Sequence, residues 1–349
     1  MAFQEVTGHA RLLSLLARAI ARDSMTPSLL LSGPAGVGKR LTATAIAQAL
    51  NCTSVAQGVL SAGALAQADS TVEEAGTACG KCPACRRIAR GVHPDVQTIE
   101  PGDMGSIKIE QVREAIDRAV FRPFEGRRRV TIIDEADALV DAAQNALLKT
   151  LEEPLPASVF ILVTARPDML LPTVRSRCAH LRFGRLQVAE VAEVLERQHG
   201  YSHADALTAA AASDGSVGRA LDLETGDFAE ARTDAENLLQ AAGRDPRTRL
   251  DRAKGLLKGG GTPAEEREHL GTRLLAMTSV LRDVGLLTSG ATDQLLANLD
   301  RRPALDALSR SLGADRVERA FAAVIEAQDA LDRNVSPKVV ADWLAINVH

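Results

Sequence analysis

Aromatic side chains are scarce in this chain, and their scarcity narrows its possible functions. Only 3% of the 349 residues are aromatic, with one Trp and one Tyr among them. Proteins that bind single-stranded nucleic acid without sequence preference stack bases on aromatic side chains. A stacking platform of that kind is therefore not expected here.

A long apolar run and an excess of one charge are also lacking. No stretch of 18 apolar residues occurs, so no membrane-spanning helix is expected. The net charge of −4 and the pI near 6.0 give no overall basic footprint for DNA. The first residues, Met-Ala-Phe-Gln-Glu-Val, have no charged region followed by an apolar stretch. We expect a cytoplasmic protein without membrane contact.

The residues that are present indicate a helical, globular protein. The chain is 46% hydrophobic and 25% charged, and it is rich in Ala and Leu. Its length predicts two or three domains, each with its own core.

The most informative motif is a glycine-rich loop with one departure. Residues 33–40 read Gly-Pro-Ala-Gly-Val-Gly-Lys-Arg, close to the phosphate-binding pattern G-x-x-x-x-G-K-[ST]. Gly33, Gly36 and Gly38 would let backbone N–H groups curl round phosphate oxygens, and Lys39 would supply a positive charge. Arg40 stands where a hydroxyl should hold Mg²⁺, and a guanidinium has only donors and cannot bind a metal. The sequence therefore predicts a phosphate-binding frame with impaired hydrolysis.

The first 184 residues predict an α/β domain, because buried strands alternate with helices. We expect a mostly parallel sheet covered by helices on both faces. The strands are expected at 29–31, 96–99, 130–133 and 159–163, and the helices at 7–21, 39–50, 109–121 and 139–153.

Acidic residues follow the strand at 130–133. Asp134 would hold Mg²⁺ and Glu135 would polarise the attacking water, as in nucleoside triphosphatases. The alternative is an acidic cluster at a helix N-terminus, with Asp137 capping a helix that begins near Ala138.

Three of the five cysteines have a spacing typical of metal sites. Cys79, Cys82 and Cys85 form C-x-x-C-x-x-C, with Cys52 upstream and Cys178 far away. In an ATPase-like chain this spacing favours a metal site over a disulfide scaffold.

The remaining segments carry weaker signals. Residues 54–78 predict a flexible insertion, residues 187–222 a few short helices, and residues 226–349 an all-helical block. The turn of Arg127, Arg128 and Arg129 is expected to be solvated, and His93-Pro94-Asp95 to be structural.

Three stretches together resemble a known family, the AAA+ clamp loaders of bacterial replication. The resemblance runs from the N-terminus to about residue 222 and is most specific between 130 and 180. It rests on Ile132-Ile133-Asp134-Glu135-Ala136-Asp137, Asn145-Ala146-Leu147-Leu148-Lys149-Thr150-Leu151-Glu152-Glu153-Pro154 and Leu171-Pro172-Thr173-Val174-Arg175-Ser176-Arg177-Cys178.

The resemblance implies three domains. Residues 1–184 would form an AAA+ P-loop domain with an inserted zinc module at 52–85. Residues 185–225 would form a small helical lid, and residues 226–349 an all-helical collar for oligomerisation. In the zinc module, Cys52, Cys79, Cys82 and Cys85 would hold a structural Zn²⁺, although the 26 residues between Cys52 and Cys79 exceed the family's usual spacing.

The resemblance also assigns roles to single residues. Arg177 would reach across a subunit interface as an arginine finger on a neighbour's ATP, with Arg175 as a nearby competitor. Thr164 would sense the γ-phosphate, and Arg219 would be a second sensor in the lid. For Thr164 and Arg219, a strand-end threonine and a helix-surface arginine without function remain equal alternatives.

Three functions fit this sequence. The first is a clamp-loader subunit of DNA polymerase III that hydrolyses little itself and donates Arg177. The second is a gamma/tau-type motor subunit of the same family, and the third is a stand-alone AAA+ motor that remodels DNA. Arg40 favours the first, with weak or absent ATP or ADP binding and Mg²⁺ in doubt. The implied partners are gamma/tau and delta subunits and, through the assembled complex, the sliding clamp and primer–template DNA.

Overall fold

The computed structural model divides the chain into two compact units. One unit comprises Met1–Val191 with Gly215–Val217, and the other comprises Ala192–Asp214 with Gly218–His349. The predicted domain limits at 184 and 225 stay predictions. The structure describes residues 3, 6–54, 76–102, 105–155, 157–222, 227–241, 245–257, 263–290, 296–298, 301–333 and 335–348. The predicted insertion at 54–78 lies outside these residues, except for residue 54 and residues 76–78.

The first unit is built on a parallel five-stranded sheet in the order β2-β3-β4-β1-β5. This confirms the predicted parallel sheet. The edge strand β5 was not predicted, because four residues of alternating burial give only a weak signal. The strands are β1 (Ser28–Ser32), β2 (Val96–Ile99), β3 (Arg129–Ile133), β4 (Ser158–Thr164) and β5 (Ala179–Arg182).

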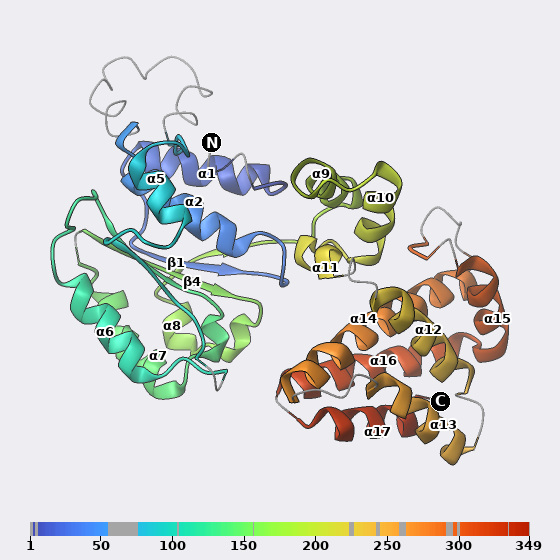
Figure 1. Cartoon of the computed structure of the whole chain (residues 1–349). Helices are drawn as coiled ribbons and strands as arrows, with labels where there is room; N and C mark the ends of the chain where they lie inside the picture. The colour runs from blue at the N-terminus through green and yellow to red at the C-terminus, as the bar shows by residue number, and fades with distance from the viewer. Residues whose placement is uncertain are drawn as a thin grey trace. The chain divides into compact units, whose positions relative to one another are not determined.

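Helices cover both faces of this sheet (Figure 1). One layer holds α1, α2 and α5, and the other holds α6, α7 and α8. The helices are α1 (Ala10–Ala21), α2 (Lys39–Asn51), α5 (Pro83–Ala89), α6 (Ile109–Ala119), α7 (Asp141–Glu152) and α8 (Pro172–Arg175), with single turns η3 (Ala136–Ala138) and η4 (Pro167–Met169).

Alternating side chains along each strand supply the two halves of the core. Leu29 and Leu31 of β1 pack with α1 and α2, whereas Leu30 between them packs with α6 and α7. The helices contribute apolar residues at helical spacing, as Leu13, Leu16 and Ile20 do on α1. The β1 strand is thereby buried on both faces, and the glycine loop follows directly at its carboxyl end.

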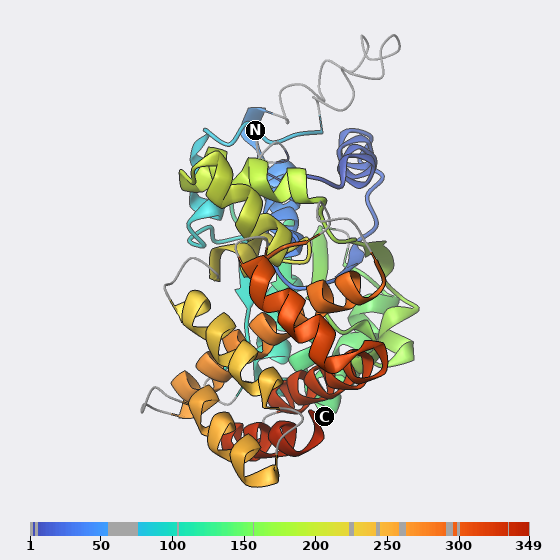
Figure 2. The same ribbon diagram turned by 90° about the vertical axis from the view of Figure 1, so that its right-hand side faces the viewer.

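The second unit is entirely helical among its described residues. Its 26-residue helix α14 packs against α12, α15 and α16, and α14 and α16 lie side by side in both ribbon views (Figures 1 and 2). Among the described helices of the chain, α14 included, none has the length and apolar character that crossing a membrane requires. The remaining helices are α9 (Val188–His199), α10 (His203–Ala212), α11 (Val217–Asp222), α12 (Asp227–Gln240), α13 (Pro246–Ala253), η5 (Lys254–Leu257), α14 (Pro263–Thr288), α15 (Arg302–Leu312), α16 (Ala314–Asp332) and α17 (Pro337–Asn347).

Candidate functional site

The glycine loop connects the carboxyl end of β1 to the first residue of α2. Gly33, Gly36 and Gly38 have φ angles of 144°, 71° and 93°, in the left-handed region that only glycine adopts without strain. Strand, loop and helix in this order point backbone N–H groups at the space in front of the helix. The predicted local context of the motif is confirmed.

Gly33 is needed for packing as well as for any ligand. A Cβ at this position would lie 2.2 Å from the carbonyl oxygen of Phe183, which follows β5. A Cβ at Gly38 would meet only a Val6 methyl at 3.7 Å. The glycine at 33 therefore does not by itself indicate phosphate binding.

Lys39 is held over the loop by the loop's own carbonyl groups. Its side chain is buried, and its Nζ donates to the carbonyl oxygens of Gly33 and Pro34 at 2.7 and 2.5 Å. Burial lowers the pKa of Lys39, and the nearby carboxylates of Asp134 and Asp137 act against this shift.

Two carboxylates meet at the neighbouring edge of the sheet. Because β2 and β3 pair with Ile99 opposite Ile133, the residues that follow them, Glu100 and Asp134, lie next to each other. The backbone N–H of Asp134 donates to the carbonyl oxygen of Ile99 at 2.9 Å. Sequence analysis missed Glu100, although its place directly after a strand was a usable signal.

Arg40 joins these two carboxylates. Its Nη1 lies 3.1 Å from an oxygen of Asp134, and its Nη2 forms an ion pair with Glu100. Arg40 thus brings a fixed positive charge to the place where a hydroxyl and the Asp134 carboxylate would hold Mg²⁺. The residues present do not fit a magnesium ion, which is a hard cation that needs oxygen ligands.

Glu135 has the environment of a carboxyl group that resists ionisation. Burial raises its pKa, and the charges of Asp134, Asp137 and Glu100 raise it further, while Arg40 lowers it. Its backbone has φ 48°, which is uncommon for a residue with a side chain. Whether Glu135 polarises a water molecule is not tested by this geometry and stays a prediction.

Asp137 does not cap a helix, which removes one alternative interpretation of the acidic cluster. Its carboxylate accepts hydrogen bonds from the Thr164 hydroxyl at 2.6 Å and from Arg166 Nε at 2.9 Å. Asp137 lies in η3, and α7 begins later, at Asp141. The buried Thr164 hydroxyl therefore contacts a carboxylate, and its role as a γ-phosphate sensor stays a prediction.

Arg177 lies at the surface two residues after the end of α8. Its Nη1 donates to the carbonyl oxygen of Thr173 at 2.9 Å, and its Nη2 forms an ion pair with Glu152 on α7. A third of its side chain is exposed (33%). The competitor Arg175 pairs instead with Asp168 at 2.9 Å. Both arginines are partly exposed, and each is paired with a different carboxylate.

Arg219, the predicted second sensor, lies on α11 in the second unit. Its Nη1 is 3.8 Å from an oxygen of Asp214. That Arg219 contacts nucleotide stays a prediction.

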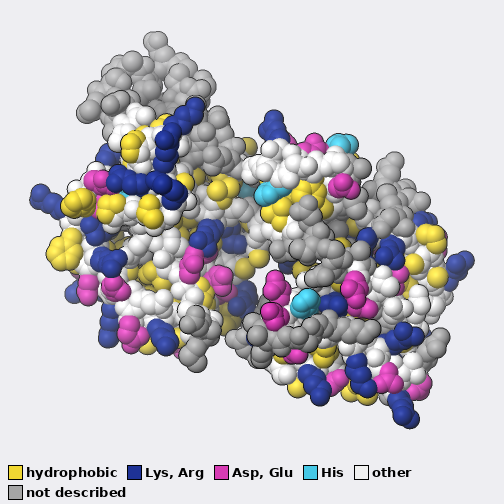
Figure 3. Space-filling view, in the orientation of Figure 1, with side chains coloured by type: hydrophobic (Ala, Val, Ile, Leu, Met, Phe, Trp, Pro, Cys, Tyr) yellow, Lys and Arg dark blue, Asp and Glu magenta, His cyan; other side chains and the backbone are white. Residues whose placement is uncertain are grey.

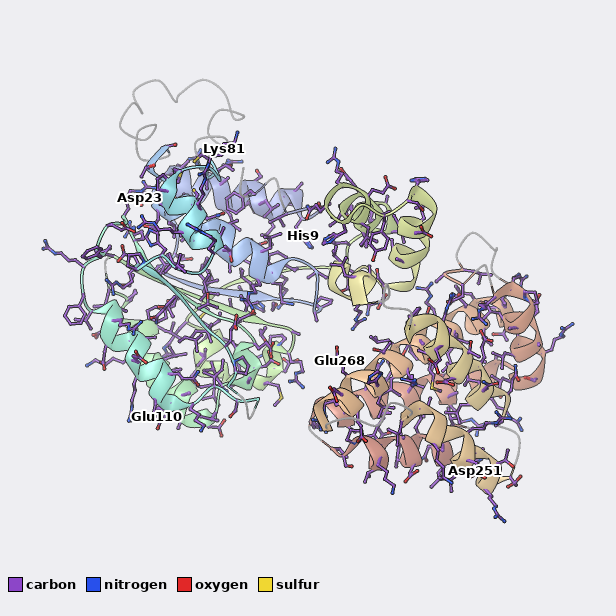
Figure 4. All side chains as sticks on the ribbon, viewed as in Figure 1. His9, Asp23, Lys81, Glu110, Asp251 and Glu268 are labelled. Atoms are coloured by element: carbon purple, nitrogen blue, oxygen red, sulfur yellow. The ribbon has the colours of Figure 1, made fainter. Side chains whose placement is uncertain are left out.

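The four predicted cysteine ligands come together. The sulfur atoms of Cys52, Cys79, Cys82 and Cys85 all lie within 4.8 Å of one another. Cys52 ends α2, and Cys82 caps α5 by accepting the backbone N–H of Cys85. Figure 4 shows Lys81 of this loop beside α5 and Glu110 at the start of α6, on opposite sides of the sheet.

The surroundings of these sulfur atoms favour thiolates at two positions. Burial alone would raise the pKa values of Cys79 and Cys82, but hydrogen bonds to their sulfur atoms outweigh it and lower them. The pKa of Cys82 falls to about 6. Burial and the neighbouring sulfur groups raise the pKa of Cys85, so a metal would have to displace its proton. Four sulfur ligands at this spacing fit a closed tetrahedral metal site.

Exposed basic side chains gather over α5 (Figure 3). Lys81, Arg86 and Arg90 are exposed, while Arg87 pairs with Glu125 at 2.7 Å. Elsewhere on this face basic and acidic side chains are mixed.

The arrangement of sheet, glycine loop and acidic strand end defines the class as a P-loop nucleoside-triphosphate-binding fold. A family model described as DNA polymerase III, delta subunit, matches residues 8–187, which is more than half of the 349 residues. The chain belongs to this family.

Relatives with curated names agree with this assignment. The chain is 39% identical over 150 residues to the DNA polymerase III subunit delta' of Pseudomonas aeruginosa, covering 43% of this chain and 40% of that protein. It is 33% identical over 195 residues to the subunit gamma/tau of Mycobacterium tuberculosis, covering 56% of this chain and 31% of that protein. It is 28% identical over 342 residues to the subunit delta' of Bacillus subtilis, covering 96% and 94%.

The first two of these matches are partial. The chain spans 40% of the length of the Pseudomonas relative and 31% of the Mycobacterium relative.

Proposed function

We propose that this chain is a delta-prime-type subunit of a DNA polymerase III clamp loader. In that role it hydrolyses little ATP and donates Arg177 to the ATP site of a neighbouring subunit while the sliding clamp is loaded onto primed DNA. The observation that carries the proposal is the ion pair of Arg40 with Asp134, which occupies the carboxylate that a hydrolysing subunit would use for its metal. The predicted cytoplasmic location belongs to this proposal.

The position of Arg177 supports a role outside this chain's own pocket. Its ion pair with Glu152 is half exposed, and such pairs contribute about 0–1 kcal/mol. A neighbouring phosphate can therefore recruit the guanidinium at small cost. A positioned arginine that stabilises charge in phosphoryl transfer is worth roughly 10³–10⁵ in rate.

The experiment is reconstitution with gamma/tau and delta subunits from the same source. Arg177→Ala should lower ATP turnover at the one site that receives the arginine by about 10³-fold, with assembly unchanged. Arg175→Ala is the matched control, because it removes an arginine two positions away that has its own partner, Asp168. Wild-type turnover at every site in the Arg177→Ala complex would show that the donated arginine is not used.

A motor of the gamma/tau type is the second candidate, because the chain is 33% identical to a gamma/tau subunit over 195 residues. This candidate requires steady ATP hydrolysis by the isolated chain. Turnover that disappears on Lys39→Ala would favour it, since contaminating ATPases would be unaffected by that substitution.

We also infer that the four-cysteine cluster holds one structural Zn²⁺. The support is the convergence of four sulfur atoms and the backbone N–H groups that donate to them, such as that of Cys82 to Cys79 at 3.3 Å. A closed site of this kind would stabilise the module without taking part in catalysis.

A further inference from the structure

The candidate nucleotide site at the carboxyl ends of β1, β2 and β3 already contains a cation. The Arg40 guanidinium binds Asp134 with one terminal nitrogen and Glu100 with the other. These two carboxylates come from adjacent parallel strands, and two neighbouring negative charges need a counter-ion. Because an arginine stays protonated under all ordinary conditions, this counter-ion cannot lose its charge.

The positive and negative side chains around this site nearly balance one another without a metal. Four carboxylates, those of Glu100, Asp134, Glu135 and Asp137, meet three cations. The cations are Lys39, Arg40 and Arg166, and Arg166 pairs with Asp137. In an ordinary phosphate-binding loop, Mg²⁺ takes the place that Arg40 fills here.

A guanidinium can also do part of what Mg²⁺ does for a phosphate. It has five N–H donors in a rigid fork. The two ion pairs do not use all five, so the remaining donors can bind a phosphate oxygen. The Arg40 side chain is 60% exposed, so these donors are accessible from solvent. The N–H groups of the glycine loop and Lys39 complete a set of donors that needs no metal.

We propose that Arg40 is a tethered cation that replaces Mg²⁺ in this loop. The candidate nucleotide site then binds nucleoside diphosphates and triphosphates without metal, and it keeps divalent cations out. Glu100 is the positioning residue, since it holds the second nitrogen of the guanidinium. The inference concerns the chain's own candidate nucleotide site and does not depend on the role of Arg177.

The first test is calorimetric titration of the full chain with ADP, in EDTA and in Mg²⁺. The wild type should bind ADP with the same affinity in both buffers. Arg40→Thr, which restores the usual hydroxyl, should bind about tenfold more weakly in EDTA and regain affinity with Mg²⁺. Arg113→Thr on the exposed face of α6 is the matched control and should behave as the wild type.

The second test uses Mn²⁺ alone, followed by electron paramagnetic resonance. Arg40→Thr frees Glu100 and Asp134 and should bind one Mn²⁺, whereas the wild type should bind none at this place. A thermal melt of each variant checks folding. The proposal is overturned if the wild type needs Mg²⁺ to bind ADP, binds no ADP at all, or takes up Mn²⁺ as tightly as Arg40→Thr does. None of these outcomes changes the result expected for the Arg177→Ala complex, because that experiment measures ATP turnover at the site of a neighbouring subunit.

Discussion

At the scale of single residues, the arginine-rich turn before β3 is held by specific bonds although it is largely exposed. Arg127 donates from Nε and Nη2 to the carbonyl oxygens of Leu50 and Ala49, which end α2 without further helical partners. Arg128 pairs with Asp23 at 2.8 Å. Arg127 therefore closes the end of α2 and Arg128 forms a surface ion pair, so specific bonds hold a turn that stays accessible to solvent.

The side chain of Asp95 binds the backbone of the same turn. Its fully buried carboxylate accepts the backbone N–H groups of Phe124, Glu125 and Gly126 at 2.6, 2.9 and 2.8 Å, and Arg129 lies 3.2 Å away. Burial alone would raise the pKa of Asp95, but these donors outweigh burial and lower it. The structural role expected for His93-Pro94-Asp95 has a physical basis in this anchor.

Asp95→Asn should destabilise the chain by about 3 kcal/mol, because an amide accepts these N–H groups less well and leaves Arg129 without its charge partner. The measurement is urea unfolding, with Asp117→Asn on the exposed face of α6 as control. Because the native pKa is lowered, the carboxylate's contribution is present above about pH 4 and is lost as pH falls through the native pKa. Asp95→Asn should lack that acid-dependent loss. Equal stability of the two variants would contradict the anchoring role.

At the scale of elements, the cysteine loop shows how a ligand set can start a helix. Cys82 caps α5, Pro83 occupies its first turn, and Cys85 lies one turn further on. The helix has only seven residues, too few to be stable in isolation. Its stability must come from contacts with α2 and, in our proposal, from bound zinc.

Cys82→Ser should abolish the one equivalent of zinc that we expect in the native protein and lower the melting temperature of the first unit. A lost structural metal removes folding free energy directly. Cys178→Ser is the control, because Cys178 is buried in the opposite core layer and should leave the zinc content unchanged. Metal analysis by atomic emission decides the question, and native protein without zinc would exclude the module.

The sequence predicts the positions of strands that are deeply buried, and it fails for a strand that is not. The strands β1, β3 and β4 are mostly apolar and almost wholly buried, and their positions follow directly from the sequence. The edge strand β5 alternates half-buried and exposed positions over four residues, which a short loop can equally show. Glu100 and Asp134 lie next to each other through the pairing of β2 with β3. That pairing joins strands that are distant in the sequence, so neither strand reveals it alone.

At the scale of the whole molecule, the described helices after residue 226 have their own core. Leu274, Met277 and Leu281 of α14 are fully buried among α12, α15 and α16. No motif in this region could be matched residue by residue, because helix packing requires only apolar residues at suitable spacing. The all-helical character could be predicted from the sequence, whereas the pairing of its helices could not.

This independent core leads to a prediction about assembly. A fragment of residues 226–349 should fold as a cooperative helical protein and join gamma/tau subunits, because we propose that this block is the collar of the ring. A fragment of residues 1–225 should retain zinc but fail to assemble alone. Circular dichroism and gel filtration with a purified gamma/tau subunit measure both properties. The buried clusters of the P-loop domain end at Phe183 and the helical cluster begins at Phe228. Division after residue 225 therefore cuts none of these clusters, and each fragment should keep its own core. Stable assembly through residues 1–225, with a folded 226–349 fragment left unbound, would place the oligomerisation surface in the P-loop domain instead.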